Sequence, residues 1–211
     1  MFRIIPRSGV VPRPLRRDEA GACIALGSNL GDRLATLRQA AGALDHLPDT
    51  RLLAVSHAYE TAPIGPPGQG PYLNAAAVLA TALPPVALLE RLQCIERDAG
   101  RPAESQRQHW GARTLDLDLL LYDQAVLDQV AGHDGPSSPA LHVPHPALHE
   151  RGFVLRPLAE IAPQTVHPVL GKRIDQLLAD LEAKHPSNDE EEDQDNDKGK
   201  DQDQDKDGMT G

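Results

Sequence analysis

The chain has 211 residues, of which 40% are hydrophobic, so length and composition favour one folded domain with a sizeable core and flanking tails. Its two cysteines, Cys23 and Cys94, exclude a disulfide framework, and we interpret both as small core residues of a protein in the reducing cytoplasm. No apolar run reaches about 18 residues and the basic N-terminal stretch lacks a long apolar core, so we expect neither a membrane helix nor a secretory signal.

Most of the formal net charge of −10 lies at the C-terminal end. Residues 189–211 contain eleven acidic residues and three lysines, with almost no apolar side chains. Such a segment cannot bury enough surface to offset the entropy cost of folding. We therefore divide the chain into an irregular N-terminal extension (1–20), one folded domain (21–184) and a disordered acidic tail (185–211). The domain is itself acidic and has no basic stripe, which argues against nucleic-acid binding.

Hydrophobic patterning along the domain alternates between the spacings of strands and of helices. The predicted strands cover residues 22–26, 51–61, 72–81 and 114–122, the last with a hairpin that returns to residue 127. The predicted helices cover residues 32–47, 84–99 and 174–181, with one or two short helices within 146–161. Loops rich in proline and glycine, above all 62–71, separate these elements. Their order predicts an α+β domain with a mainly antiparallel sheet flanked by helices.

The segment RTLDLDLLLYD carries the strongest chemical signal. Because side chains alternate along a strand, Asp116 and Asp118 are expected on one face, opposite a row of four leucines: Leu115, Leu117, Leu119 and Leu121. Two carboxylates so close repel each other unless a cation lies between them, and oxygen ligands without cysteine favour Mg²⁺ over Zn²⁺. Taken alone, such a D-x-D pair is more often two exposed acids at a strand edge.

Arginines surround this acidic pair. Arg113 lies three residues before Asp116, and Arg101 and Arg107 lie upstream in an irregular segment. A metal-bound polyphosphate needs cations at its remaining oxygens, and arginine binds them bidentately. The chain has neither the G-x-x-x-x-G-K-[ST] of a P-loop nor the G-x-G-x-x-G of protein kinases. We therefore predict a Mg²⁺–nucleotide site built from carboxylates and arginines.

A second group of side chains suits a flat, polar ligand. Trp110, the only tryptophan, lies in a polar loop, either as an anchor of that loop or as a surface for a ring. Tyr72 and Asn74 fall on one face of a strand, and an asparagine amide matches the edge of a heterocycle. His145, in LHVPHP, is either a capping group or, with Arg151, a phosphate contact. The other histidines are spaced too irregularly to predict a zinc site.

Four segments together resemble the 6-hydroxymethyl-7,8-dihydropterin pyrophosphokinase family of folate biosynthesis: ALGSNLGDR, YETAPIGPPGQGPYLNAAA, WGARTLDLDLLLYD and VPHPALHERGFVLRPLAEIAP. They cover about residues 21–165 in the family's order and spacing. The resemblance implies a ferredoxin-like α+β fold and transfer of pyrophosphate from ATP to the pterin's hydroxymethyl oxygen, with release of AMP. It also implies two Mg²⁺ ions. The expected partners are these two small molecules, with no nucleic acid and no membrane, and we expect a monomer.

The resemblance assigns roles to residues at matching positions. The metal ligands would be Asp116 and Asp118, and the catalytic arginines Arg101 and Arg113. The pterin contacts would be Thr61, Ala62, Ile64, Tyr72, Asn74, Trp110 and Phe153. The ATP contacts would be Gln93, Glu96, Arg107, Arg113, His145 and Arg151.

The loop after Gly100 departs from the family pattern GRxRxxRWGPR. It reads GRPAESQRQHWGAR, which is about two residues longer, with Ala103 and His109 at two arginine positions. Arg107 is a candidate substitute for one of them. This departure leaves open a catalytically weakened pterin or nucleotide binder of the same fold. A different metal-dependent nucleotidyl or phosphoryl enzyme is a second alternative.

Overall fold

The computed structural model describes residues 2–3, 14–63, 65–100, 111–129 and 139–184. Its strands are β1 (Phe2–Arg3), β2 (Ala20–Ser28), β3 (Thr50–Val55), β4 (His57–Thr61), β5 (Tyr72–Thr81), β6 (Asp116–Tyr122), β7 (Leu127–Gln129) and β8 (Leu141–Val143). Its helices are α1 (Arg33–Asp45), α2 (Pro85–Asp98), α3 (Gly152–Ile161) and α4 (Ile174–Lys184), with a short 3₁₀ helix η2 (Leu148–Glu150).

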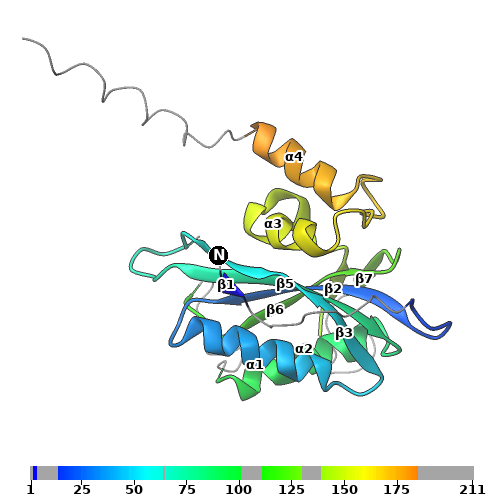
Figure 1. Cartoon of the computed structure of the whole chain (residues 1–211), viewed down its shortest axis with the longest axis horizontal. Helices are drawn as coiled ribbons and strands as arrows, with labels where there is room; N and C mark the ends of the chain where they lie inside the picture. The colour runs from blue at the N-terminus through cyan, green and yellow to red at the C-terminus, as the bar shows by residue number, and fades with distance from the viewer. Residues whose placement is uncertain (1, 4–13, 64, 101–110, 130–138, 185–211) are drawn as a thin grey trace, which may run out of the picture.

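Six strands form one antiparallel sheet in the order β1-β4-β5-β2-β6, in which β3 also pairs with β5 (Figure 1). β7 and β8 form a separate antiparallel pair. The long strands β2 and β5 lie at the centre, and most of their alanines are buried. The prediction of an α+β domain with an antiparallel sheet flanked by helices is confirmed.

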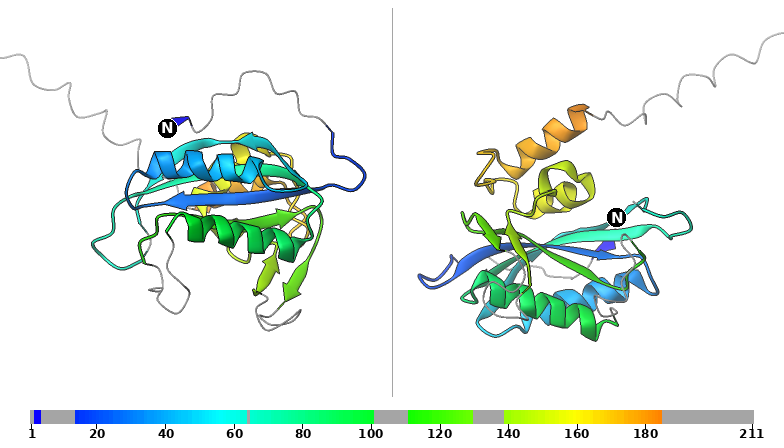
Figure 2. Two further views of the ribbon diagram at one scale, coloured as in Figure 1. Left: turned by 90° about the horizontal axis from the view of Figure 1, so that it is seen from below. Right: turned by 180° about the vertical axis from the view of Figure 1, so that it is seen from behind.

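Helices cover both faces of the sheet. α1 and α2 lie on one face, whereas α3 lies against the other face with α4 packed on it (Figures 1 and 2). β2 contributes to both cores, because Ile24 packs on the α1–α2 side and Cys23 on the α3–α4 side. Burial raises the pKa of the Cys23 thiol to about 12, so this cysteine is an inert core residue, as predicted. Cys94 is half-buried.

A bulge makes β6 supply side chains to both cores. The pairing with β2 shifts between Cys23 and Ile24, which leaves Leu120 as an extra residue. Alternate leucines before the bulge pack in the α1–α2 core: Leu115, Leu117 and Leu119. Beyond it, Leu121 packs in the α3–α4 core together with Leu120. The prediction that all four leucines share one face is therefore wrong at Leu121, because a bulge reverses the alternation.

The predicted strand 51–61 consists of two strands that pair with different halves of β5. Ser56 separates the two strands, and its hydrogen bonds maintain the contact with β5 at this break. Its backbone N–H donates to the Ala76 carbonyl at 2.9 Å, and its hydroxyl accepts from the Ala76 N–H at 2.9 Å while donating to the His57 carbonyl at 2.7 Å. A side chain thus satisfies a buried backbone donor that a regular strand would have paired.

The predicted hairpin from 114–122 to 127 is wrong. The turn itself is present, with Asp123 in the left-handed region (φ 44°) and the Ala125 N–H donating to the Tyr122 carbonyl at 2.9 Å. After this turn, β7 does not pair with β6. It pairs with β8, which comes from the segment after residue 138.

The N-terminal segment contributes a short strand to the domain. β1 pairs with β4, so part of segment 1–20 joins the main sheet. The proposed boundaries at 20 and 184 stay predictions, and segment 185–211 lies outside the described residues. No helix of the described part is long and apolar enough to cross a membrane.

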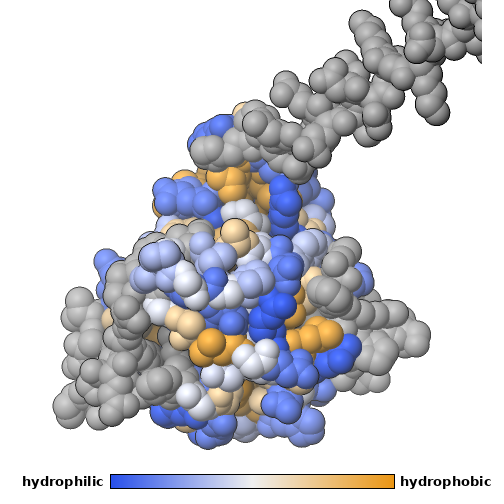
Figure 3. All heavy atoms as spheres, turned by 90° about the vertical axis from the view of Figure 1, so that its left-hand side faces the viewer, coloured by the Kyte–Doolittle hydropathy of each residue, from blue (hydrophilic) through white to orange (hydrophobic). Residues whose placement is uncertain are grey.

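The side of the molecule drawn in Figure 3 is mostly hydrophilic, with hydrophobic side chains in small groups. Six large hydrophobic residues are exposed among those described: Leu15, Leu30, Val126, Val166, Val169 and Leu170. Three of these lie in the α3–α4 connection. Scattered exposed side chains of this kind are ordinary on a folded protein.

The substitution Ser56→Ala tests the role of the serine between β3 and β4. It leaves the buried Ala76 N–H without its acceptor, so the free energy of unfolding should fall by about 1–3 kcal/mol. The matched control is Thr36→Ala, which removes an exposed hydroxyl–carbonyl bond on α1 and should cost less than about 0.5 kcal/mol. Urea denaturation measures both, and equal small changes would contradict the interpretation.

Candidate active site

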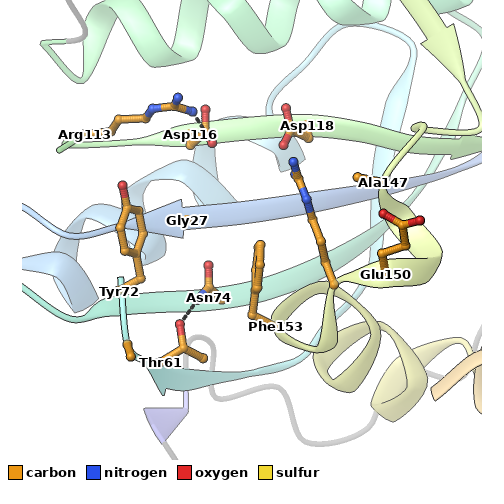
Figure 4. Close-up of a pocket in the computed structure, with 12 residues that line it drawn as sticks. Gly27, Thr61, Tyr72, Asn74, Arg113, Asp116, Asp118, Ala147, Glu150 and Phe153 are labelled. Carbon is orange, nitrogen blue, oxygen red and sulfur yellow. Dashed lines mark hydrogen bonds and ion pairs between the residues drawn. The ribbon is translucent and has the colours of Figure 1, made fainter. Parts of the chain in front are cut away.

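A pocket of about 470 Å³ opens on the α3 face of the sheet (Figure 4). β2, β5 and β6 supply its floor, the end of β4 supplies one wall, and the segment through η2 to α3 supplies the other. The pocket is lined by Gly27, Thr61, Ala62, Tyr72, Asn74, Arg113, Asp116, Asp118, Ala147, Glu150, Arg151 and Phe153.

The two aspartates of β6 lie side by side at one end of this pocket. In the β2–β6 register, Asp116 is opposite Gly27 and Asp118 is opposite Ala25, so both aspartates of β6 lie beside a strip of β2 without bulky side chains (Figure 4). Both precede the bulge, which keeps them on the same face. The leucine between them, Leu117, is buried on the opposite side of the sheet.

Arg113 lies next to the acids. Its Nη1 donates to Oδ2 of Asp116 at 2.7 Å, and both side chains are partly exposed. Burial alone would lower the pKa of the Arg113 guanidinium, but the charges of Asp116 and Asp118 and the hydrogen bond to Asp116 raise it on balance. The side chain therefore stays cationic, and this end of the pocket combines two carboxylates with a fixed positive charge.

The opposite end is built from β4 and β5. The Asn74 Nδ2 donates to the Thr61 Oγ1 at 2.7 Å, which fixes the orientation of the amide (Figure 4). Tyr72 precedes Asn74 by two residues on the same face of β5, and its hydroxyl donates to the Gly111 carbonyl at 3.4 Å. One N–H of the Asn74 amide is thus used internally, and its Oδ1 and second N–H can face a ligand.

An aromatic ring from α3 forms a third side. Phe153 lies in the first turn of α3, and in Figure 4 its ring and that of Tyr72 stand on either side of Asn74. The Arg151 Cζ lies 5.8 Å from the centroid of the Phe153 ring, within the range of a cation–π contact. A flat ligand on Asn74 could therefore stack on Phe153 and reach the Arg151 guanidinium.

His145 lies beside the pocket rather than in its lining. Its backbone N–H donates to the Leu120 carbonyl at 2.8 Å, and its Nδ1 accepts from the Ala147 N–H at 3.2 Å, so a neutral ring carries its proton on Nε2. Burial, helped by the positive charge of Arg151, lowers the pKa of the imidazole to about 4. At neutral pH the ring is an uncharged donor.

Gln93 and Glu96 lie on α2, across the sheet from Phe153, and neither lines the pocket as described. Glu96 is buried, and its Oε1 accepts from the Leu117 N–H at 2.8 Å. This bond holds the backbone of the edge strand β6 between the two aspartates. The predicted contact of both α2 residues with ATP stays a prediction.

Four residues predicted for the site lie outside the described residues: Ile64, Arg101, Arg107 and Trp110. Within the described ranges, no group of three or more His, Cys, Asp or Glu side chains could hold a metal ion. Mg²⁺ is commonly bound by one or two carboxylates, with waters and substrate phosphates completing its octahedron. The pair Asp116 and Asp118 therefore suits Mg²⁺ that is shared with a phosphate ligand.

Three lining residues were not singled out from the sequence: Gly27, Ala147 and Glu150. A signal existed for Gly27, because a glycine inside an apolar strand often marks a close approach. A Cβ at this position would lie 3.4 Å from the Asn74 Oδ1 and 3.9 Å from the Tyr72 Cδ1. The missing side chain thus leaves the pocket floor open. Neither Ala147 nor Glu150 belongs to a sequence pattern that predicts a binding site.

The fold and the pocket define an α+β domain with a charged, carboxylate-bearing end and an amide-and-aromatic end in a single pocket. The sequence model of one family, 7,8-dihydro-6-hydroxymethylpterin-pyrophosphokinase, matches residues 23–163. The chain belongs to this family.

Two curated relatives are each named 2-amino-4-hydroxy-6-hydroxymethyldihydropteridine pyrophosphokinase. The one from Pseudomonas aeruginosa is 42% identical over 156 residues, which is 74% of this chain and 88% of the relative. The one from Bacillus subtilis is 42% identical over 155 residues, which is 74% of this chain and 86% of the relative. Both matches span most of the described domain.

Solved structures share the fold at low sequence identity. An HPPK-DHPS structure in complex with substrates has a TM-score of 0.60 at 16% identity over 79% of this chain. Wild-type HPPK-DHPS from Plasmodium falciparum with pterin and p-hydroxybenzoate has a TM-score of 0.61 at 15% identity, also over 79%. The chain spans under half of either protein, 45% and 44% respectively.

The lowered pKa of His145 makes a prediction about stability. The folded-state pKa of about 4 lies below the ordinary value of 6.5, so the unfolded chain binds the proton first as pH falls. The buried neutral imidazole therefore makes its full contribution to the free energy of unfolding above pH 6.5. This contribution is lost as the pH falls from 6.5 to 4. In His145→Asn, the new amide oxygen can accept from the Ala147 N–H but the side chain does not titrate. Its loss of unfolding free energy from pH 8 to pH 5 should therefore be smaller than that of the wild type by about 1 kcal/mol, a value reduced for the partial exposure of the ring.

The measurement is urea denaturation of both proteins at pH 8 and pH 5. The pH 8 values give the packing cost of the substitution, because the imidazole is neutral in both states there. Equal losses of stability in the two proteins would contradict a buried, neutral His145.

Proposed function

We propose that this protein transfers the pyrophosphoryl group of ATP to the hydroxymethyl oxygen of 6-hydroxymethyl-7,8-dihydropterin, which yields AMP and the pterin diphosphate in folate biosynthesis. Its family membership supports this reaction. The observation that carries the proposal is the division of one pocket into two ends. Asp116, Asp118 and Arg113 suit a polyphosphate, and Asn74 and Phe153 suit a flat heterocycle.

The pterin would lie on Asn74. The free N–H and the Oδ1 of this amide offer a donor and an acceptor to the ring edge, while Thr61 holds the amide in place at 2.7 Å. Phe153 would stack on one face of the ring, and Thr61 and Ala62 would close the wall at the end of β4. Gly27 leaves room for the ring above the sheet.

Asp116 and Asp118 would hold two Mg²⁺ ions together with the phosphates of ATP. When bound, Mg²⁺ neutralises the polyphosphate and helps to align the hydroxyl with the β-phosphorus. The carboxylates are prepared for this role, because their strand is fixed by β2 on one side and by Glu96 at Leu117.

The remaining polar groups would bind the phosphates and the nucleotide. Arg113, held cationic by Asp116, would neutralise charge on the transferred group. Arg151 and the Nε2–H of His145 would contact the ATP side. Transfer of this kind relies on positioning and charge neutralisation. By resemblance we propose further roles for residues around these groups, including those outside the described ranges: Gln93, Glu96, Arg101, Arg107, Trp110 and Ile64. The cytoplasmic location and the monomeric state are likewise proposals.

The substitution Asp118→Asn tests the metal site. It preserves size but removes the charge, so AMP release from ATP and the pterin should fall by about 100-fold or more, with the free energy of unfolding changed by less than about 1 kcal/mol. Asp128→Asn is the matched control, because Asp128 is an exposed acid on β7 outside the pocket. Near-normal turnover of Asp118→Asn at saturating Mg²⁺ would contradict the metal-ligand role.

The substitution Gly27→Ala tests the pterin end. The new methyl group would lie 3.4 Å from the Asn74 Oδ1, in van der Waals contact, and would occupy the space on the pocket floor that the ring needs. Overpacking of about 1–3 kcal/mol should weaken equilibrium pterin binding by roughly 10-fold or more. Gly42→Ala on α1 is the control, because its Cβ would meet open space. Pterin affinity equal in both variants would place the ring elsewhere.

A further inference from the structure

Asn29 is a buried polar residue beside the pocket that does not line it. It directly follows β2, is 6% exposed, and makes three hydrogen bonds. Its backbone N–H donates to the Arg113 carbonyl at 3.1 Å, and its Oδ1 accepts from the Arg113 N–H at 2.6 Å. Its Nδ2 donates to the Gln69 Oε1 at 3.2 Å. One side chain therefore connects two segments that are far apart in sequence.

The two bonds to Arg113 continue the β2–β6 pairing past its last regular pair. That pair is Gly27 with Asp116, and Arg113 itself precedes β6 and belongs to no strand. Asn29 supplies both the donor and the acceptor that a paired strand would have supplied. The backbone of Arg113 is thereby held, so its guanidinium can bond to Asp116 without a large loss of conformational entropy.

The third bond reaches the loop 62–71, which begins at the pterin wall. Gln69 in turn donates to the Pro66 carbonyl at 3.3 Å within the same loop. Arg33 anchors the end of the loop, because its Nη1 donates to the Pro71 carbonyl at 2.7 Å and lies 2.9 Å from a carboxylate oxygen of Glu60. The turn after β2 therefore holds the loop and the Arg113 segment together.

From this geometry we propose that Asn29 is a positioning residue. It fixes Arg113 against Asp116 at the phosphate end of the pocket and connects that end to the loop at the pterin end. The proposal rests on the proposed function, since Arg113 acts on phosphate only if the pocket binds ATP. Asn29 itself does not touch the substrates, and its effect on turnover passes through Arg113.

The experiment is a double-mutant cycle on the full chain, with AMP release from ATP and the pterin at saturating Mg²⁺ as the readout. Asn29→Ala should lower kcat by about 10–100-fold. In the Arg113→Ala background the same substitution should lower kcat by less than about threefold, because the group through which it acts is gone. If Asn29→Ala does not fold, Asn29→Ser replaces it in the cycle.

Two further variants separate positioning from simple loss of stability. Asn29→Asp keeps the acceptor for the Arg113 N–H and loses the donor to the Gln69 Oε1, so it should lower kcat clearly less than Asn29→Ala does. Ser56→Ala removes a buried polar group away from the pocket and should leave kcat unchanged despite its cost in stability. A kcat loss in Ser56→Ala as large as that in Asn29→Ala would overturn the positioning role.

The outcomes distinguish the two proposals. An active wild type with additive effects of Asn29→Ala and Arg113→Ala on kcat would overturn the role of Asn29 alone. An Asn29→Asp variant as impaired as Asn29→Ala would do the same. A wild type that releases no AMP with the pterin present would overturn the proposed function, and the role of Asn29 with it.

Discussion

The site depends on the pairing of β2 with β5 on one side and with β6 on the other. This register places Gly27 between Asn74 and Asp116. An amide, a glycine without a side chain and a carboxylate therefore lie in one row across three neighbouring strands. Adjacent strands lie about 4.8 Å apart, which sets roughly 10 Å between the amide and the carboxylate. A slip of one residue in either pairing would turn one of these groups to the opposite face. The distance between the two ends of the pocket is therefore a property of the sheet.

The bulge in β6 allows one strand to serve the site and both cores. Before it, alternate leucines pack against α1 and α2 while Asp116 and Asp118 face the pocket. After it, Leu121 packs with Leu120 under α3 and α4. A regular strand would have placed Leu120 on this side but turned Leu121 to the α1–α2 side. The helix that carries Phe153 thus packs on leucines that follow Asp116 and Asp118 closely in sequence.

The short segments around the pocket are held by side-chain bonds to backbone rather than by regular structure. Asn29 holds Arg113, and Glu96 holds Leu117. Each supplies a partner to a backbone group at a point where strand pairing ends or is interrupted, as the burial of such groups requires. These two polar residues therefore position the backbone that carries the charged residues of the pocket.

The sequence by itself determined the class of fold, most of the strands and helices, the acidic pair and the family, because these depend on local periodicity and on motifs of adjacent residues. Strand alternation also grouped Tyr72 with Asn74, whereas Phe153 joined them only through the resemblance. The tertiary structure alone decided the break at Ser56, the pairing of β7 with β8, the face of Leu121, and the places of Gly27 and Asn29. Each of these is a relation between residues distant in the chain, and it is set by register, by a bulge or by a buried hydrogen bond that no local pattern encodes.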